Sequence, residues 1–187
     1  FIHSEGNMTT FDHHEFNNSV QGVQPGIIGA ERLPTRGYFN FGQNSSWANA
    51  ENGRFVDGYV RFFGNNKFLF PIGDNDKFRP AAISGGSYVE ACYYGIDPTI
   101  AITSDLKGGN YPILPLTGPY DAQLHQNDIT IVSEYEYWDI NGTDATIITL
   151  TWDDESNIGA ITSNELATLT IAGWDGDKWV ALPSTVD

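Results

Sequence analysis

The sequence predicts an all-β fold: an antiparallel, jelly-roll-like β-sandwich with a short β-rich segment at its N-terminus. Apolar and polar residues alternate through Arg54–Ile83 and again through Asp128–Ile140, which is the period of half-buried strands. Aromatic residues make up 13% of the chain, and 20 glycines and 9 prolines supply the turns that many short strands require. Together these observations favour a β-sandwich over a helical or α/β fold.

The amino-acid composition of the chain changes near residue 52. Residues 1–52 are polar and rich in Asn, Gly and Ser, with isolated apolar positions. We expect them to form an N-terminal β-rich segment of short strands, of the kind that ends a repetitive region. Such a segment buries little apolar surface by itself, so it needs a neighbour to pack against. Residues 53–187 are predicted to form the sandwich module.

The middle of the chain predicts a hairpin followed by two further strands. Residues 54–70 alternate as two β-type runs joined at Gly64–Asn66, and these residues suit the positive φ angles of hairpin turns. Pro71 then ends the ladder or confines it to an edge. Ala81–Ser84 and Ser87–Tyr94 are the next strands. Four prolines and repeated glycines then indicate irregular chain over Asp97–Pro119.

The C-terminal third predicts two more hairpins. In Asp128–Ile140 the residues Ile129, Ile131, Ser133, Tyr135 and Tyr137 would share one face, and Ala145–Trp152 would be the partner strand across an Asn-Gly turn. Leu166–Ala172 and Lys178–Leu182 would form the second hairpin across residues 174–177. The tryptophans in or beside these strands are expected in the core; they are Trp138, Trp152, Trp174 and Trp179.

The charge balance excludes several classes of partner. The chain has 24 acidic and 9 basic residues and a net charge of −15. Such a surface lacks the cations that bind nucleic-acid phosphates, and anionic membranes repel it. No apolar run approaches the length that spans a membrane. We therefore expect no nucleic-acid partner and no membrane insertion by this segment.

Two residue patterns suggest metal binding. In Asp12-His13-His14-Glu15 the adjacent histidines would point to opposite faces of a strand, which disfavours a shared zinc ion, and nothing in the sequence brings His3 or His125 close. Acidic loops offer oxygen ligands for calcium instead. Ordinary turn chemistry explains the same residues, because Asp and Asn favour turns. No cofactor is certain, and Ca²⁺ is the candidate ion, with these proposed ligands: Asp74, Asp76, Asp153, Glu155 and Asn157.

The acidic loop Asp153–Asn157 superficially matches the calcium loop of helix–loop–helix proteins. It departs from that template because Ile158 stands where glycine is required and Glu165 lies one position too late. The Asp175-Gly176-Asp177 loop is a further source of oxygen ligands. The calcium prediction therefore depends on clustering of loops in space, which the sequence does not give.

A ligand-binding platform for sugars is a separate prediction. Tyr111 and Tyr120 lie in the Pro/Gly-rich stretch, where exposure of aromatic rings is expected, and Trp47 lies in the N-terminal segment. We take Trp47, Tyr111 and Tyr120 as the candidate ligand-binding residues.

Catalysis has weaker support in the sequence. Glu134, Glu136 and Asp139 could supply paired carboxylates for glycoside hydrolysis, but Glu134 and Glu136 are two apart and would share one solvated strand face. No nucleophile elbow, phosphate loop or dinucleotide fingerprint occurs. We therefore predict no catalytic residues and no enzymatic activity.

Three longer stretches form a distinctive set of motifs: NGRFVDGYVRFFGNNKFLFPIGDNDKFRPAAI, then VSEYEYWDINGTDATIITLTWDD, then LTIAGWDGDKWVAL. Together they resemble a recurring module of large secreted Bacteroidetes proteins. The resemblance covers about Asn52–Leu182, and residues 1–52 match only loosely, like the last coils of a repetitive β-rich region. It implies a parent protein that is exported by the type IX secretion system and acts as an adhesin or gliding-associated surface protein. It implies no catalytic residues.

These arguments together predict a non-catalytic module of a bacterial cell-surface or secreted protein, located outside the cell, that acts in adhesion or as a structural spacer. Expected partners are a surface glycan or another cell-envelope component, together with flanking domains of the parent protein. The alternative is a carbohydrate-binding module or an accessory domain of a polysaccharide-degrading enzyme.

Overall fold

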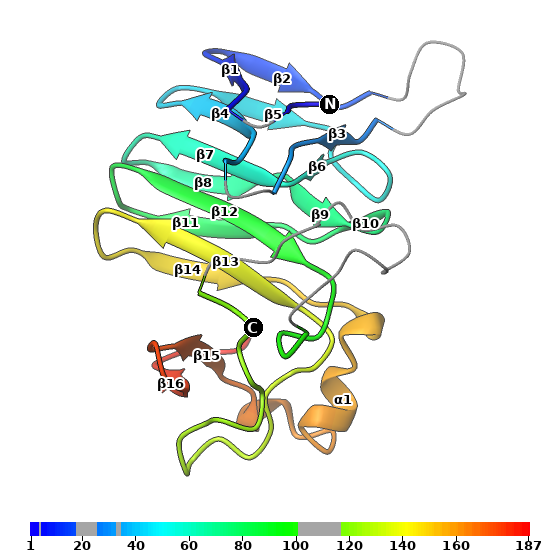
Figure 1. Ribbon diagram of the computed structural model, residues 1–187, viewed down its shortest axis with the longest axis vertical. Coiled ribbons are helices and arrows are strands. Elements are labelled where there is room, and N and C mark those ends of the chain that lie inside the picture. The colour runs from blue at the N-terminus through cyan, green and yellow to red at the C-terminus, as the bar shows by residue number, and fades with distance from the viewer. Residues whose placement is uncertain (4, 18–25, 33–34, 101–116) are drawn as a thin grey trace.

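The computed structural model describes residues 1–3, 5–17, 26–32, 35–100 and 117–187 (Figure 1). These residues form strands in several sheets, with only short helices near the C-terminus. The prediction of an all-β fold with sheets packed on one another is confirmed. No described helix is long and apolar enough to cross a membrane.

The first part of the chain winds into coils that stack on one another, from β1 to β9 (Figure 1). Each coil has three strands, and equivalent strands of neighbouring coils pair in parallel: β1 with β4 with β7, β2 with β5, and β3 with β6 with β9. The strands are β1 (Asn7–Thr10), β2 (His13–Glu15), β3 (Ile28–Gly29), β4 (Tyr38–Gly42), β5 (Ser46–Ala48), β6 (Val56–Asp57), β7 (Tyr59–Phe63), β8 (Lys67–Phe70) and β9 (Ile72–Asp74).

The chain then reverses and continues the same stack in the opposite direction. Strands β10, β11 and β12 pair antiparallel with β9, β8 and β7, and β13 and β14 pair antiparallel with β12 and β11. The antiparallel pairing predicted within 53–187 therefore holds for every described ladder there except β6–β9. The added strands are β10 (Lys77–Phe78), β11 (Ala81–Ser84), β12 (Val89–Tyr94), β13 (Tyr137–Gly142) and β14 (Ile147–Leu150).

The C-terminal part lies at the end of the stack opposite β1 (Figure 1). It contains η1 (Asp154–Ser156), α1 (Ile158–Ile161), η2 (Leu166–Thr168), β15 (Ile171–Trp174) and β16 (Trp179–Leu182). Strands β15 and β16 pair antiparallel, so the last predicted hairpin and its turn are confirmed. Its first strand begins later than predicted, because residues 166–168 form a 3-10 turn.

The other two predicted hairpins are wrong in their pairing. Strand β7 pairs with β4 and β12, whereas β8 pairs with β11, so Gly64–Asn66 carries the chain from one sheet to another. Likewise β13 pairs with β12 and β14 pairs with β11. The apolar faces of β7 and β8 meet across the core instead, where the rings of Phe62 and Phe68 stack with centroids 4.2 Å apart. Alternation identifies the buried face of a strand but not its neighbour.

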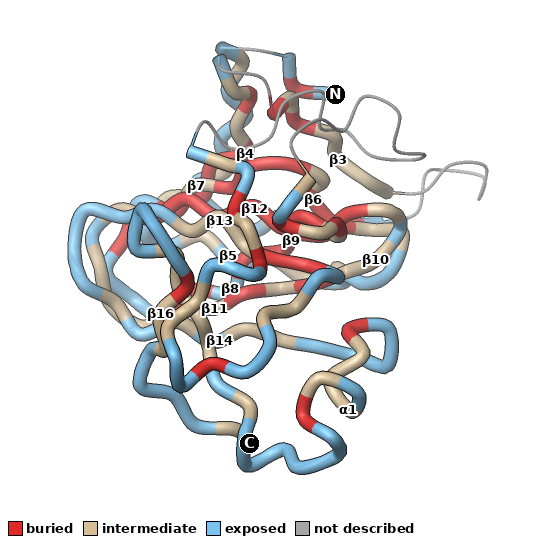
Figure 2. Tube along the Cα trace, turned by 60° about the horizontal axis from the view of Figure 1, so that its bottom comes forward, coloured by how far each residue is buried: buried red, intermediate tan, exposed pale blue. Residues whose placement is uncertain are grey.

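Each coil contributes one strand to each of three sides of the stack, and the inner core lies between these sides. Buried residues from β4, β6, β7, β8, β9, β11 and β12 contribute to it, and Phe16 and Ile2 extend it into the first coil (Figure 2). Strands from 1–52 and from 53–187 therefore share one core and one five-stranded sheet, β1-β4-β7-β12-β13. The N-terminal segment packs against the module, as its low apolar content requires.

A second, outer cluster covers part of the outer face of that five-stranded sheet. Tyr59, Cys92, Tyr94 and Tyr137 point outward from the sheet and pack against residues of the C-terminal part. Trp179 is buried there, Trp174 packs at its edge, and Trp138 packs against the inner core, as predicted for these tryptophans. Trp152 is exposed, so its predicted place in the core is wrong.

Candidate functional site

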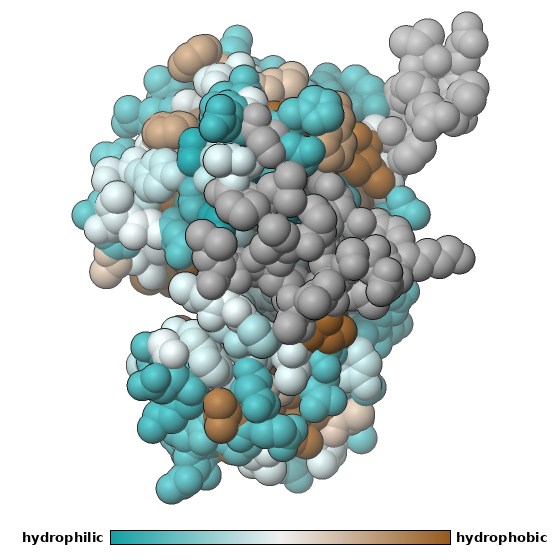
Figure 3. Space-filling view, viewed as in Figure 1, coloured by the Kyte–Doolittle hydropathy of each residue, from teal (hydrophilic) through white to brown (hydrophobic). Residues whose placement is uncertain are grey.

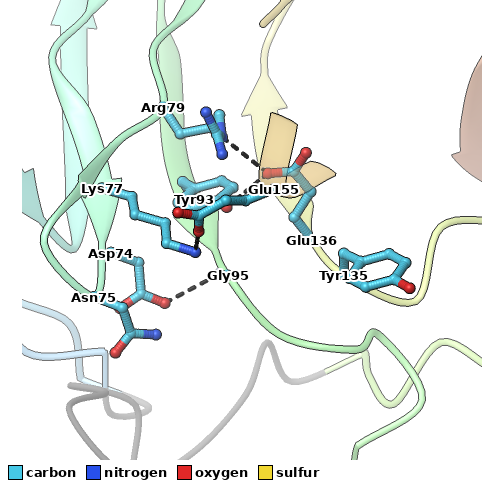
Figure 4. A pocket seen from close by; sticks show the side chains of 9 residues that line it. All are labelled: Asp74, Asn75, Lys77, Arg79, Tyr93, Gly95, Tyr135, Glu136 and Glu155. Atoms are coloured by element: carbon cyan, nitrogen blue, oxygen red, sulfur yellow. Dashed lines mark hydrogen bonds and ion pairs between the residues drawn. The ribbon is translucent and has the colours of Figure 1, made fainter. Parts of the chain in front are cut away.

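A polar cavity of about 170 Å³ opens where the β9–β10 turn meets the segment that follows β14 (Figure 4). Its walls come from residues that lie far apart in the sequence. Two cations and three carboxylates face it, together with two tyrosines, an amide and a backbone segment. The lining residues are Asp74, Asn75, Lys77, Arg79, Tyr93, Gly95, Tyr135, Glu136 and Glu155.

The β9–β10 turn places the first wall of the cavity. Lys77 pairs with Asp74, and the two residues between them, Asn75 and Asp76, have φ angles of 51° and 65°. Asn and Asp adopt this left-handed conformation more readily than other side chains, and two-residue hairpin loops require it. Gly73 lies so close to the carbonyl oxygen of Lys77 that a Cβ would collide with it. Local sequence therefore determines the turn.

The floor of the cavity is a buried ion pair. Arg79 Nε donates to Glu136 Oε2 at 2.9 Å, and the two side chains are only 5% and 6% exposed. The hydroxyl of Tyr93 donates to the same carboxylate oxygen at 2.6 Å. Burial, followed by the charge of Glu136, raises the pKa of Tyr93, so this hydroxyl stays protonated. These contacts hold the charged side chains of Arg79 and Glu136 in fixed positions inside the protein.

A second ion pair ties the segment after β14 to this floor. The guanidinium of Arg79 bonds both carboxylate oxygens of Asp153, each at 2.7 Å. These hydrogen bonds hold the pKa of Asp153 below its ordinary value. The Asp153 side chain also caps η1 by accepting from the backbone N–H of Glu155. The bidentate contact therefore positions the whole 153–157 segment.

Further polar contacts surround the cavity, and those of Lys77, Glu155 and Tyr135 are the more exposed ones. Lys77 Nζ forms an ion pair with Glu155, and both side chains are more than a third exposed. Across the cavity, Asn157 Nδ2 donates to the hydroxyl of Tyr135 at 2.7 Å. The backbone N–H of Gly95 donates to Asp74 Oδ2 at 3.0 Å. The rim is thus polar, with the half-exposed ring of Tyr135 as its aromatic member.

The structure brings together the two loops that hold the predicted calcium ligands. Asp74 and Glu155 line the cavity, while Asp76 is exposed at the turn. However, Asp153 and Glu155 bind protein cations, and Asn157 donates to a tyrosine. Within the described residues, no three or more His, Cys, Asp or Glu side chains gather closely enough to hold a metal ion. The carboxylates thus neutralise Arg79 and Lys77.

The predicted aromatic platform is divided between two places. Trp47 is half-buried between Phe16 and Phe78, and its Nε1–H donates to the carbonyl of Leu69 at 2.6 Å. Tyr120 is only 8% exposed in the outer cluster, against Trp174 and Trp179. Tyr111 lies outside the described residues. Tyr93 and Tyr135 border the polar cavity, and neither is among the three candidate residues.

The candidate carboxylates for catalysis do not converge. Glu136 is buried beneath Arg79, Glu134 is exposed, and Asp139 lies in β13 on the opposite side of the sheet from the inner core. There Asp139 accepts a hydrogen bond from the Tyr59 hydroxyl and lies 3.5 Å from Arg36 Nη2. The shared face predicted for Glu134 and Glu136 is wrong, because strand β13 begins only at Tyr137.

The two adjacent histidines point to opposite faces of β2, as expected for a strand. His13 Nδ1 lies 2.9 Å from Ser46 Oγ at the surface, whereas the His14 ring packs against Phe16 and Phe39. Burial, and then the neighbouring His13, lower the pKa of His14. A ring held neutral against two phenylalanines acts as part of the core.

Arginines and aromatic rings also alternate on the outer face of the five-stranded sheet. The guanidinium of Arg36 lies 3.9 Å from the ring centroid of Tyr59, and that of Arg61 lies 3.0 Å from that of Tyr38. Glu90 bonds both arginines. These charges are mutually satisfied, so this face is a stabilised surface and not an open site.

Comparison with protein families, with curated proteins and with solved structures finds no match to this chain.

Proposed function

We propose that the chain is a non-catalytic module of a bacterial cell-surface or secreted protein, acting in adhesion or as a structural spacer. The observation that supports this best is the coil-on-coil stacking of β1 to β9. On two sides of the stack, equivalent strands of all three coils pair in register, as β1-β4-β7 and β3-β6-β9, so each coil extends the stack by about 4.8 Å. An architecture of this kind holds attached parts at a defined spacing.

The surface fits the same role. Polar residues dominate the described part of the face in Figure 3, and hydrophobic residues there form separate spots. A net charge of −15 keeps such a module soluble and disfavours binding to anionic surfaces. Partners of this module would be recognised through hydrogen-bonding loops, so a glycan or another cell-envelope component remains the proposed partner class.

Cell-surface display and attachment test the proposal. An epitope tag within the parent protein should be reached by an antibody on intact cells of the encoding bacterium. Deletion of this module should reduce attachment to a surface without removing the parent from the cell exterior. A tag reached only after cell lysis, or attachment unchanged by the deletion, would contradict the proposal.

The alternative function, a carbohydrate-binding module, is favoured by one observation. The cavity beside Tyr135 combines hydrogen-bond donors, acceptors and an exposed aromatic ring. This combination is common where proteins orient small polar ligands.

A further inference from the structure

We propose that the cavity between the β9–β10 turn and the 153–157 segment binds a single neutral sugar ring. This inference rests on the adhesion role proposed above, in its carbohydrate-binding form, and it names the site and the ligand class. Five features carry it: the size of the cavity, the mixed charges of its walls, the location of Tyr135, the exposed ion pair at its mouth and the rigidity of its floor.

The size of the cavity limits the ligand. Its volume of about 170 Å³ corresponds to about six water molecules at roughly 30 Å³ each. Pockets for drug-sized ligands are larger, at about 300–1,000 Å³. A single pyranose ring or the end of a glycan chain matches this volume, whereas an extended oligosaccharide would have to continue outside the cavity.

The mixed charges of the walls select a neutral ligand. Glu155 offers acceptors and Lys77 offers donors at the mouth, above the buried side chains of Asp74, Glu136 and Arg79. A hydroxyl group both donates and accepts, so a ring with several hydroxyls can bond walls of both kinds. An anion would face three carboxylates in a chain of net charge −15, and a divalent cation would face two protein cations.

Tyr135 supplies the apolar contact that a sugar ring needs. Figure 4 shows its ring across the cavity from Lys77 and Asp74. The ring is 48% exposed, and its hydroxyl is held by Asn157. A ring that is already fixed loses little conformational freedom on binding, and its face can pack against the C–H groups of a pyranose.

The ion pair at the mouth allows a ligand to enter. Lys77 and Glu155 are 39% and 60% exposed, and such surface pairs contribute little to stability. Sugar hydroxyls can therefore replace this contact at small cost. The buried pair beneath, Arg79 and Glu136, stays in place because it is held by Tyr93 and Asp153.

Titration of the purified chain with monosaccharides tests the proposal. The panel consists of the methyl glycosides of glucose, galactose, mannose and N-acetylglucosamine, with galacturonate as the anionic comparison, and binding is followed by NMR and calorimetry. At least one neutral glycoside should bind with a millimolar dissociation constant. Tyr135→Ala and Glu155→Gln should each weaken that binding at least tenfold, while Tyr135→Phe, which keeps the ring, should retain most of it.

Matched control variants lie outside the cavity. Glu134→Gln removes an exposed carboxylate next to Tyr135, and Tyr88→Ala removes a tyrosine whose hydroxyl bonds Glu90. Both should bind the sugar within twofold of the unaltered chain. Thermal unfolding of every variant separates loss of binding from loss of the fold.

Three outcomes would overturn this site. They are no binding of any neutral glycoside at tens of millimolar, equal binding by Tyr135→Ala, and tighter binding of galacturonate than of the galactose glycoside. A chain that binds no sugar while deletion of the module still abolishes cell attachment would overturn the sugar site alone and leave the proposed function standing.

Discussion

At the scale of single residues, the floor of the site consists of two charged and almost fully buried side chains, Arg79 and Glu136. Removing charges from water is costly, and a buried pair offsets that cost only when its geometry is good and its remaining hydrogen bonds are made. Arg79 meets this condition, because it bonds Glu136 on one side and both oxygens of Asp153 on the other. Removal of Arg79 leaves Glu136 charged and buried, whereas Asp153 stays partly exposed.

We therefore expect Arg79→Met to lower the free energy of unfolding by about 3–5 kcal/mol, because Glu136 would remain buried without its cation. Urea denaturation measures the change. Lys77→Met is the control, since its ion pair is exposed, and it should change stability by less than about 1 kcal/mol. Equal effects of the two substitutions would mean that the Arg79 network does not exist in solution.

The lowered pKa of His14 leads us to expect that stability depends on pH. Its pKa is lowered in the folded protein by burial, so the unfolded chain takes up the proton first as pH falls. Stability associated with His14 is therefore fully present above its ordinary pKa of about 6.5 and decreases as pH falls below that value.

Urea denaturation at about pH 7 and about pH 5 tests this dependence in the unaltered chain and in His14→Phe. The variant keeps an aromatic ring against Phe16 and Phe39 and cannot titrate. The unaltered chain should lose more stability over this interval than the variant does. An identical loss would show that His14 titrates alike in both states.

At the scale of elements, the β9–β10 turn is determined by its own two residues. Both central residues have positive φ angles, which β-branched side chains tolerate poorly. We expect Asp76→Val to destabilise the protein by about 1–2 kcal/mol, whereas Asp76→Gly should be neutral or slightly stabilising. Comparison of the two variants by urea denaturation isolates the backbone effect. A Val variant as stable as the Gly variant would contradict the turn geometry.

Residues that are in register in successive coils test whether β1 lies at the edge of the stack. Met8, Phe39 and Val60 are in register in β1, β4 and β7, yet Met8 is 46% exposed and Phe39 is fully buried. Phe39→Ala should therefore cost about 3–5 kcal/mol, while Met8→Ala should cost about 1 kcal/mol or less. Thermal and urea unfolding measure both. Similar losses at the two positions would place β1 inside the stack instead of at its edge.

At the scale of the whole molecule, the question is what balances so many negative charges. The acidic loops nearest one another hold Lys77 and Arg79 between them, so protein cations take the place that an added ion would fill. We expect the unfolding temperature in about 5 mM calcium to agree within about 2 °C with that in EDTA at equal ionic strength. Magnesium serves as a second control. A rise of several degrees specific to calcium would contradict this expectation and support the calcium site predicted from the sequence.

The fold was predictable where the signal is local. The alternation in Ala81–Ser84 and Ser87–Tyr94 marked strands that the structure contains, and the hairpin around Trp174 and Trp179 also forms. The prediction of a strand over Asp128–Ile140 is wrong before Tyr137, where β13 begins, and Glu136 just before it pairs with Arg79, which lies 57 residues away. No local pattern contains such a partner.

The candidate site was predictable only in its parts. The acidic turn at Asp74–Asp76 and the loop at Asp153–Asn157 were both singled out from the sequence, and both border the cavity. Their basic partners Lys77 and Arg79, and the neighbouring Tyr135, were missed as members of a site. The sequence places Tyr135 next to Glu136, but strand alternation predicts that these two side chains point to opposite faces.

The sequence by itself determined that this protein is all-β, that the acidic loop at residues 74–76 favours a turn, and that the chain carries a net charge of −15, because these properties depend on side-chain period, backbone preference and composition. Only the tertiary structure decided which strands are neighbours and which charges meet at the cavity. Alternation specifies a buried face and leaves its partner open, so the coil stack and the Lys77, Arg79 and Tyr135 site arise from contacts between distant segments.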